Sequence, residues 1–390
     1  MRRQPAGTRL QVDRTTRDRA RGTCGIDLVV DDVMTRTLQL DRAEEELGRC
    51  LARARSLQPS DPTGKVDERD PHGRRKVPSL VMHRQRTKLA SRVNRVASAV
   101  ERRGIVATYE LHDRLLSNRS SRRRYAAAPP ELDSVQRQLV EQLDAEGFVT
   151  IPFGDLHADA SLHEEIDRFA DDFVERTERA IADGTAKVRP GKEFVAREYS
   201  FEGATLDAGD PWFRACVSRR MLDVANGYLR LWSKLSYVDY WYTAPQPAAE
   251  DRIASQLWHF DFDDKHLLKG FLYLTDVDEG TGPFEYVPGS QPGGRFHGVR
   301  PWAPMGYGRV GEDEVASQVP DGHVATFTAP RGTLIFCNTS GLHRGGFATS
   351  NPRVLATATY CSPASLASLS RRNYTSTLAT DDPAARFAIS

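Results

Sequence analysis

The spacing of apolar residues differs between two parts of this 390-residue chain. Between residues 132 and 231, apolar positions in several stretches recur every three or four residues, as they do from Leu132 to Leu143, and this period predicts amphipathic helices. After residue 234 the apolar residues gather in short runs rich in β-branched and aromatic side chains, which predicts buried strands. We therefore expect a β-rich core with helices packed around it.

The individual elements follow from these patterns. A glycine, Gly147, stands where the first helix of the folded body should end, and Gly favours the left-handed conformation common at helix ends. The predicted class is an all-β core with flanking helices, an α+β arrangement. The expected helices span 132–146, 162–182 and 212–231, and the expected strands span 148–152, 234–243, 270–274, 284–287, 332–336 and 354–360.

Residues 1–127 differ from the remainder in charge. They hold 29 Lys and Arg against 16 Asp and Glu, whereas residues 128–390 hold 25 against 37. Helices are predicted over 33–57 and 80–118, disorder over 58–76, and a linker at Arg119–Arg124. We therefore expect a basic, partly helical and partly disordered extension over 1–127 and a folded domain over 128–390.

The basic extension admits a contact with nucleic acid, an acidic surface or a partner. A solvated, Arg-rich extension explains the same composition, and no helix-turn-helix, zinc-finger or RNA-binding signature accompanies it, so we expect no nucleic-acid partner. Five scattered cysteines without a Cys-x-x-Cys pair favour a reducing compartment. No apolar run reaches the roughly 20 residues of a membrane span. These features predict a cytoplasmic protein, and nothing in the sequence specifies its oligomeric state.

Candidate chemistry begins at His259 and Asp261, which stand two residues apart. On a strand, residues i and i+2 point to one face, so the imidazole and the carboxylate would aim at one point. Two imidazoles and one carboxylate form a facial triad that leaves three positions of an octahedral iron(II) open, and His343 would complete it. Arg353 is a permanent cation suited to grip the far carboxylate of a 2-oxoacid with two parallel hydrogen bonds.

These residues, with Thr281-Gly282-Pro283 and Val287-Pro288-Gly289-Ser290 between them, resemble the phytanoyl-CoA dioxygenase family. The resemblance runs from about Leu139 to about Ser362. It implies a double-stranded β-helix, a cupin-like jelly roll whose mouth holds the metal.

The resemblance also implies an iron(II)- and 2-oxoglutarate-dependent dioxygenase, in which His259, Asp261 and His343 hold the metal and Arg353 holds 2-oxoglutarate. The expected reaction consumes O2, converts 2-oxoglutarate to succinate and CO2, and hydroxylates or otherwise oxidises an unactivated C–H bond of a small metabolite. Asp261 argues against a halogenase, because halogenases of similar fold carry a small residue there. The alternative is a cupin-type metal-binding protein, a hydrolase, an isomerase or a binding module, that uses the triad without 2-oxoglutarate.

Further candidates stand near these motifs. Gln256, three residues before His259, and Tyr240, on the strand over 234–243, are predicted to contact the 2-oxoacid. Asp263 and Asp264 are expected to be solvated loop acids. Candidate residues on the substrate side are Lys192, Glu193, Arg197, Tyr242 and His266.

Two positions depart from the family's pattern. The family often carries His after Pro-Gly-Ser, where this chain has Gln291, so no general base is expected there. A hydroxyl residue often follows the distal His by two positions and helps to hold the oxoacid, and here that residue is Gly345.

Overall fold

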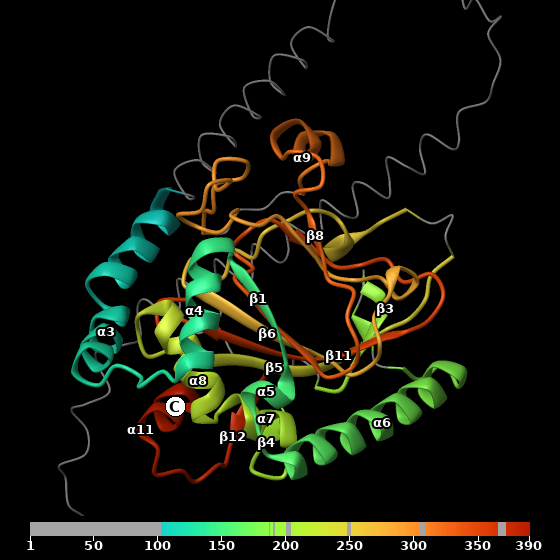
Figure 1. The fold of residues 1–390 in the computed structure, drawn as a ribbon, viewed down its shortest axis with the longest axis horizontal. Coiled ribbons are helices and arrows are strands. Elements are labelled where there is room, and N and C mark those ends of the chain that lie inside the picture. Colours follow the sequence, from blue (N-terminus) through green and yellow to red (C-terminus); the bar gives the residue numbers. More distant parts are fainter. Residues whose placement is uncertain are drawn as a thin grey trace, which may run out of the picture. The chain divides into compact units, whose positions relative to one another are not determined.

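Two β-sheets pack against each other at the centre of the structure, a computed structural model (Figure 1). An apolar cluster joins them, with Phe271 and Tyr273 from the larger sheet and Tyr286 from the smaller one. This β core with flanking helices confirms the predicted class. The structure describes residues 103–186, 188–189, 192–199, 204–247, 251–304, 309–365 and 372–390.

The larger sheet has seven strands and is antiparallel throughout. In spatial order they are β1 (Phe148–Pro152), β9 (Thr333–Cys337), β6 (Leu267–Tyr273), β11 (Arg353–Cys361), β5 (Lys234–Thr243), β3 (Lys192–Arg197) and β2 (Val188–Arg189). The smaller sheet has the order β10 (His343–Arg344), β7 (Glu285–Tyr286) and β8 (Ala325–Thr326), and a separate parallel pair joins β12 (Tyr374–Ser376) to β4 (Ala204–Leu206).

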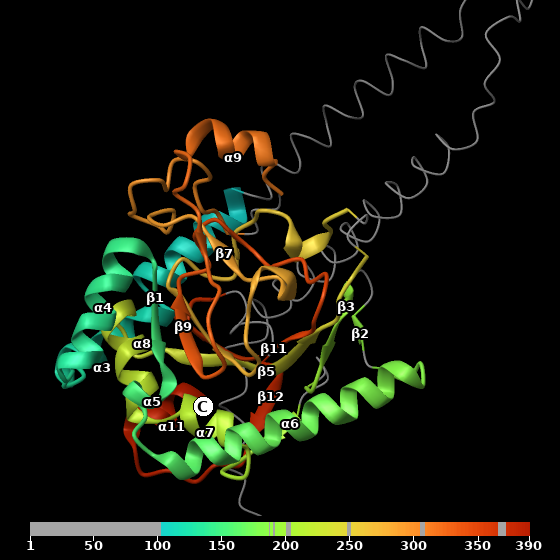
Figure 2. The same ribbon diagram turned by 45° about the vertical axis from the view of Figure 1, so that its right-hand side comes forward.

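Helices cover one face of the larger sheet, which we call the outer face, whereas α9 (Glu312–Gln318) lies elsewhere (Figure 1). Figures 1 and 2 show α6 lying along this face, where Phe169 of the helix stacks on Tyr240 of β5 with ring centroids 4.6 Å apart. The helices of this part of the chain are α4 (Ser134–Glu146), α5 (Phe153–Leu156), α6 (Ala160–Ala182), α7 (Pro211–Cys216) and α8 (Arg219–Leu229). Farther along the chain come α9 (Glu312–Gln318) and α11 (Pro383–Ile389).

Local signals explain where these helices begin and end. Asp133 and Gln136 form a capping box at the start of α4, and Gly147 ends it with φ 81°, as predicted. The single helix expected over 212–231 is two helices, because Ser218 caps a new start by accepting a hydrogen bond from the Met221 N–H. The other helices and strands predicted from residue 132 onward are confirmed, with ends that differ by up to three residues.

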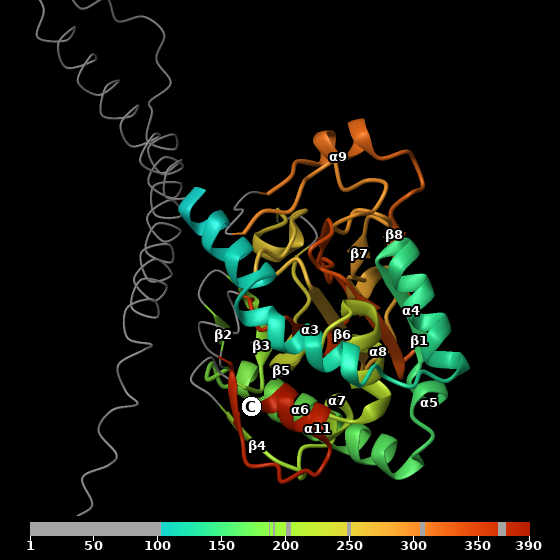
Figure 3. The ribbon, with the colours of Figure 1, turned by 90° about the vertical axis from the view of Figure 1, so that its left-hand side faces the viewer.

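Residues 103–127 form a helical segment that packs on the rest of the described chain. Residues 103–114 are helical, α3 (Ser117–Ala127) follows, and the linker expected at Arg119–Arg124 lies inside α3. Figure 3 shows α3 beside α11, where the Arg124 guanidinium lies 5.4 Å from the Phe387 ring. We call residues 103–127 the N-terminal helical segment.

The helix predicted over 33–57, the disorder over 58–76 and the start of the helix over 80–118 lie outside the described residues. None of the helices in the described part of the chain combines the length and the apolarity that a membrane span requires.

Candidate metal centre

Two histidines from distant parts of the chain lie side by side. His259 and His343 form an antiparallel β-bridge, in which the His259 N–H donates to the His343 carbonyl at 2.9 Å and the His343 N–H donates back at 2.8 Å. Directly opposed residues of such a bridge project to the same face. Their ring centroids are accordingly 4.3 Å apart.

Backbone carbonyls also determine which nitrogen of each imidazole carries the proton. Nδ1 of His259 lies 2.8 Å from the Leu257 carbonyl, and Nδ1 of His343 lies 2.9 Å from the Gly341 carbonyl. A carbonyl oxygen only accepts, so Nδ1 carries the proton in both rings and Nε2 keeps its lone pair. A histidine that binds a metal through one ring nitrogen typically donates the N–H of the other in this way, so both Nε2 atoms can bind a metal.

Asp261 completes the set. One ligand atom from each of His259, Asp261 and His343 lies within 4.8 Å of the others. The Asp261 N–H donates to the Thr339 carbonyl at 2.8 Å, and the Asp261 carbonyl accepts from the Trp302 indole at 2.9 Å. The structure therefore brings the three predicted ligands together. Asp261, the one that lies in a loop, is held by hydrogen bonds at both its backbone N–H and its backbone carbonyl.

Lys269 contacts this site and was missed by the sequence reasoning. Its ammonium donates to Oδ2 of Asp261 at 2.6 Å. Lys269 lies two residues before Phe271 on β6, so it shares the inner face of the sheet with that ring. The signal that could have identified it is a single cation at an inward-facing position of an otherwise apolar strand.

Electrostatics give each member of the triad the protonation state that a metal requires. Burial alone would raise the pKa of Asp261, but the Lys269 ammonium beside it holds this pKa well below its usual range. Burial lowers the pKa of both His259 and His343. At neutral pH the site is thus two neutral imidazoles and one carboxylate, the forms in which these side chains bind metals.

Arg353 is a buried cation without an anionic partner among the described residues. Its side chain is nearly inaccessible, Nη1 donates to the Gly282 carbonyl, and Nε has no hydrogen-bond partner in the described part of the chain. Burial lowers its pKa, and the nearby Tyr273 phenol only partly opposes this effect. A buried guanidinium in this state is costly unless an anion pairs with it. Arg353 is therefore suited to bind the carboxylate of a small molecule.

Two glycine-bearing motifs meet beside Arg353. A Cβ on Gly346 would lie 1.9 Å from the Gly282 carbonyl oxygen, so the two backbones can approach only because residue 346 has no side chain. Gly345, the departure from the family's pattern, donates its N–H to the Ser255 carbonyl at 2.7 Å. This close packing aims the Gly282 carbonyl at the guanidinium.

The structure does not bring Tyr240 to this site. Tyr240 is completely buried on the outer face between β5 and α6, whereas its neighbours Asp239 and Trp241 point to the inner face. The predicted contact between Tyr240 and the 2-oxoacid selected the wrong face of the strand. Gln256 is also buried, with its carbonyl accepting from the Ile253 N–H and its amide donating to Gln246.

Two of the candidate substrate residues are engaged elsewhere. Tyr242 shares the outer face with Tyr240, and its hydroxyl donates to Glu178 of α6 at 3.3 Å. His266 lies 3.1 Å from the carboxylate of Asp113 in the N-terminal helical segment.

Of the other three candidates, Arg197 lies on the inner face. It donates to the Tyr237 hydroxyl at 3.2 Å, and its guanidinium lies 4.8 Å from the Trp241 ring. Lys192 is half-buried and Glu193 is exposed at the start of β3. Arg197 is thus the one of these three candidates whose contacts place it on the inner face.

The chain matches the model of the family described as phytanoyl-CoA dioxygenase over residues 144–354, which is more than half of its length. No curated protein sequence matches it.

Several solved structures are remotely similar. EctD from S. alaskensis with bound Fe is 19% identical, with 60% of this chain and 78% of that chain covered and a TM-score of 0.41. The epimerase SnoN from nogalamycin biosynthesis is 18% identical, with 59% and 81% covered and a TM-score of 0.39. HygX from Streptomyces hygroscopicus with nickel, 2-oxoglutarate and hygromycin B bound is 15% identical, with 58% and 87% covered and a TM-score of 0.37.

Proposed function

Because the chain belongs to the phytanoyl-CoA dioxygenase family, whose members are iron(II)- and 2-oxoglutarate-dependent oxygenases, we propose that it hydroxylates or otherwise oxidises an unactivated C–H bond of a small metabolite. Iron(II), 2-oxoglutarate and O2, the cofactors expected from the sequence, are those of this family. The observation that carries the proposal is Arg353, a buried cation with no acidic partner in the described part of the chain.

The triad fits the metal. His259 and His343 would bind iron(II) through Nε2, because Nδ1 of each ring already faces a backbone carbonyl. Asp261 would bind through one carboxylate oxygen while Lys269 holds Oδ2. Bound there, iron(II) would supply O2 activation coupled to the conversion of 2-oxoglutarate to succinate and CO2.

The protein's own residues would orient the reactants and exclude water. Arg353 would bind the far carboxylate of 2-oxoglutarate in a charge-assisted pair. Phe271, Tyr273 and Leu355 line the inner face of the sheet as a buried apolar wall, which strengthens that pair by removing water. We take the two packed sheets as the walls of the predicted jelly roll, and residues 128–390 as the oxygenase domain.

Arg353 separates this proposal from the alternative. A cupin-type metal protein that works without a 2-oxoacid would use the same three ligands, but it would gain nothing from the buried guanidinium. Retention of Asp261 also favours hydroxylation over halogenation, because the carboxylate occupies the position that a halide would need.

The test is an anaerobic titration of the full-length protein, first with iron(II) and then with 2-oxoglutarate, followed by visible spectroscopy. We expect a weak metal-to-ligand charge-transfer band that needs both additions, and succinate formation once air is admitted. Asp261→Ala should abolish both signals, whereas Asp276→Ala, which removes an exposed carboxylate, should leave them unchanged. Iron binding without any band that depends on 2-oxoglutarate would support the cupin-type alternative instead.

A further inference from the structure

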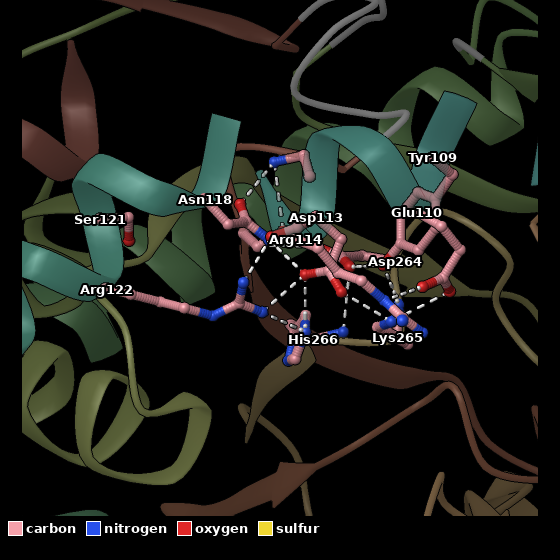
Figure 4. A network of polar contacts seen from close by, with 12 residues as sticks. Tyr109, Glu110, Asp113, Arg114, Asn118, Ser121, Arg122, Asp264, Lys265 and His266 are labelled. Atoms are coloured by element: carbon pink, nitrogen blue, oxygen red, sulfur yellow. Dashed lines mark hydrogen bonds and ion pairs between the residues drawn. The ribbon is translucent and has the colours of Figure 1, made fainter. Parts of the chain in front are cut away.

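The loop that follows Asp261 is held in place by the N-terminal helical segment (Figure 4). We call residues 262–266 the ligand loop, because they lead from Asp261 into β6. Asp264 of this loop, expected to be solvated, is completely buried. Its Oδ1 accepts from the Tyr109 hydroxyl at 2.5 Å, and its Oδ2 accepts from the Ser362 N–H at 2.7 Å.

A second contact centres on Asp113, which is 2% exposed. Its carboxylate accepts from the ammonium of Lys265 at 2.7 Å and lies 3.1 Å from Nε2 of His266, so it binds two consecutive residues of the ligand loop. Arg122 and Asn118 of the same helical segment donate to it as well, each at 2.7 Å. Burial alone would raise the pKa of Asp113, but its hydrogen bonds with His266, Lys265 and Asn118 hold it well below its usual range.

The segment is also anchored on the strand that carries Arg353. Asn118 is completely buried. Its amide donates to the Ser362 hydroxyl at 3.0 Å, and its carbonyl accepts from the Ala364 N–H at 2.9 Å. Both partners lie just beyond the end of β11, so the segment joins the ligand loop to the sheet.

Two sets of contacts link Tyr109 to the residues around Asp261. Its hydroxyl accepts from the Lys265 N–H at 3.1 Å, within the ligand loop. Its ring lies 5.1 Å from the ring of Trp302, whose indole donates to the Asp261 carbonyl at 2.9 Å. A change at Tyr109 should therefore displace the loop and the backbone of Asp261 together.

We propose that the N-terminal helical segment is part of the scaffold of the metal site, with Tyr109 and Asp113 as positioning residues for Asp261. The inference rests on the proposed function in taking Asp261 as a metal ligand. A ligand on a loop binds well only if neighbouring contacts fix its position before the metal arrives. Buried charges such as Asp113 could be replaced by apolar packing if stability were their sole role. Here they converge on the loop next to a ligand.

The test measures cobalt(II) binding by the full-length protein, through its visible spectrum and dissociation constant. Tyr109→Phe keeps the ring and removes one hydroxyl, and we expect it to weaken cobalt affinity about three- to tenfold. This is less than the 10–100-fold typical of groups bonded directly to a ligand. Asp113→Asn should weaken it further and alter the spectrum, because the loop ammonium of Lys265 loses its counter-charge.

Two control variants separate positioning from stability. Arg119→Ala changes an exposed side chain of the same helical segment, and should bind cobalt as the wild type does. Phe173→Leu weakens the core beneath α6 without contact to the ligand loop, and should lower the unfolding temperature but not the cobalt affinity.

The outcomes are distinct. Wild-type affinity in both Tyr109→Phe and Asp113→Asn, with binding lost in Asp261→Ala, would overturn the positioning role and leave the oxygenase proposal intact. An equal loss in Phe173→Leu would also overturn it, as a general effect of stability. If the wild type binds cobalt but shows no band with iron(II) and 2-oxoglutarate, the proposed function fails, and the cobalt affinities still decide the role of the segment. If Asp113→Asn does not fold, Tyr109→Phe decides alone.

Discussion

The two faces of the seven-stranded sheet are both buried, yet they carry different kinds of side chain. The outer face presents Tyr240 and Phe336 among aliphatic residues, packed under the helices. The inner face presents Lys269 and Arg353 among aromatic residues, opposite the smaller sheet. Arg353 and Asp239 on the inner face are as buried as the outer-face side chains, although Lys269, Tyr237 and Trp241 are half-buried. Exposure to solvent therefore does not explain the buried charge at Arg353.

The difference indicates what each face does. Apolar packing on the outer face stabilises the fold in proportion to the area removed from water. The charges of the inner face oppose folding unless something pairs with them. Asp261 and Lys269 pair with each other, but Arg353 has no such partner in the described part of the chain. Substitution of the unpaired cation Arg353 on the inner face should therefore change ligand binding more than stability, and substitution of large apolar residues on the outer face the reverse.

The largest effect should come from His343→Ala. This substitution removes one of the two imidazoles that would bind the metal through Nε2. Affinity for cobalt(II) or iron(II) should fall by more than about 100-fold, because changing a group that only hydrogen-bonds to a ligand already costs about 10–100-fold. Anaerobic equilibrium titration measures this. His323→Ala, at a half-buried histidine that contacts Arg295, is the matched control and should bind metal normally. Unchanged affinity in His343→Ala would exclude the triad as the metal site.

Next comes Arg353→Leu, which replaces the unpaired cation by an apolar side chain. Loss of a buried charge pair costs about 2–5 kcal/mol, so affinity for 2-oxoglutarate should fall about 30-fold or more, measured by titration of the charge-transfer band. The free energy of unfolding without ligand should stay the same or rise, because an unpaired buried charge is removed. Arg331→Leu, at a surface arginine paired with Asp167, is the control. A strong loss of stability with unchanged affinity would make Arg353 a structural residue.

The same comparison explains what the sequence could predict. His259, Asp261, His343 and Arg353 belong to short motifs in a fixed order, so they were identifiable without coordinates. The strands were identifiable as well, because apolar runs and turn residues are local signals. The break between α7 and α8 was not predicted, because it depends on a single residue, Ser218, that caps the second helix and does not alter the apolar periodicity.

The remaining features depend on register and on contacts between distant residues. On β5 the alternation was evident, but only the packing of α6 shows which face turns away from the metal, so Tyr240 was assigned to the wrong face. His266 and Asp113 lie 153 positions apart, and no local pattern predicts their contact. For the same reason the N-terminal helical segment was read as part of a charged extension, since its buried Asp113 and Asn118 look like surface residues in sequence.

A smaller effect, on the pH dependence of stability, should come from Asp239→Asn on the inner face. Burial raises the pKa of Asp239 to about 6, against 3.8 for the free side chain, although N–H groups of Tyr199 and Tyr240 donate to it. The folded state therefore binds the proton more tightly than the unfolded state, and the free energy of unfolding should fall as pH rises from about 4 to about 6. The contribution is on the order of 2–3 kcal/mol.

Asp239→Asn cannot titrate, so its stability relative to the wild type should rise by about 2 kcal/mol between pH 4 and pH 7, measured by denaturant unfolding. Asp276→Asn, at an exposed carboxylate, should show no such change. If wild type and Asp239→Asn keep a constant difference across this range, Asp239 titrates normally and the inner face is more hydrated than its burial indicates.

The smallest effect should come from Tyr240→Phe on the outer face. The Tyr240 hydroxyl is buried and forms no hydrogen bond to any described residue, so its removal should change the free energy of unfolding by less than about 1 kcal/mol, toward greater stability. Affinity for 2-oxoglutarate should stay within about twofold of the wild type. Tyr237→Phe makes the same chemical change on the inner face, where the hydroxyl donates to Asp239 and accepts from Arg197, and it should destabilise by about 1–3 kcal/mol. The pair tests the two faces of one strand with a single atom removed from each. A loss of 2-oxoglutarate affinity in Tyr240→Phe would mean that this strand presents the opposite face to the metal.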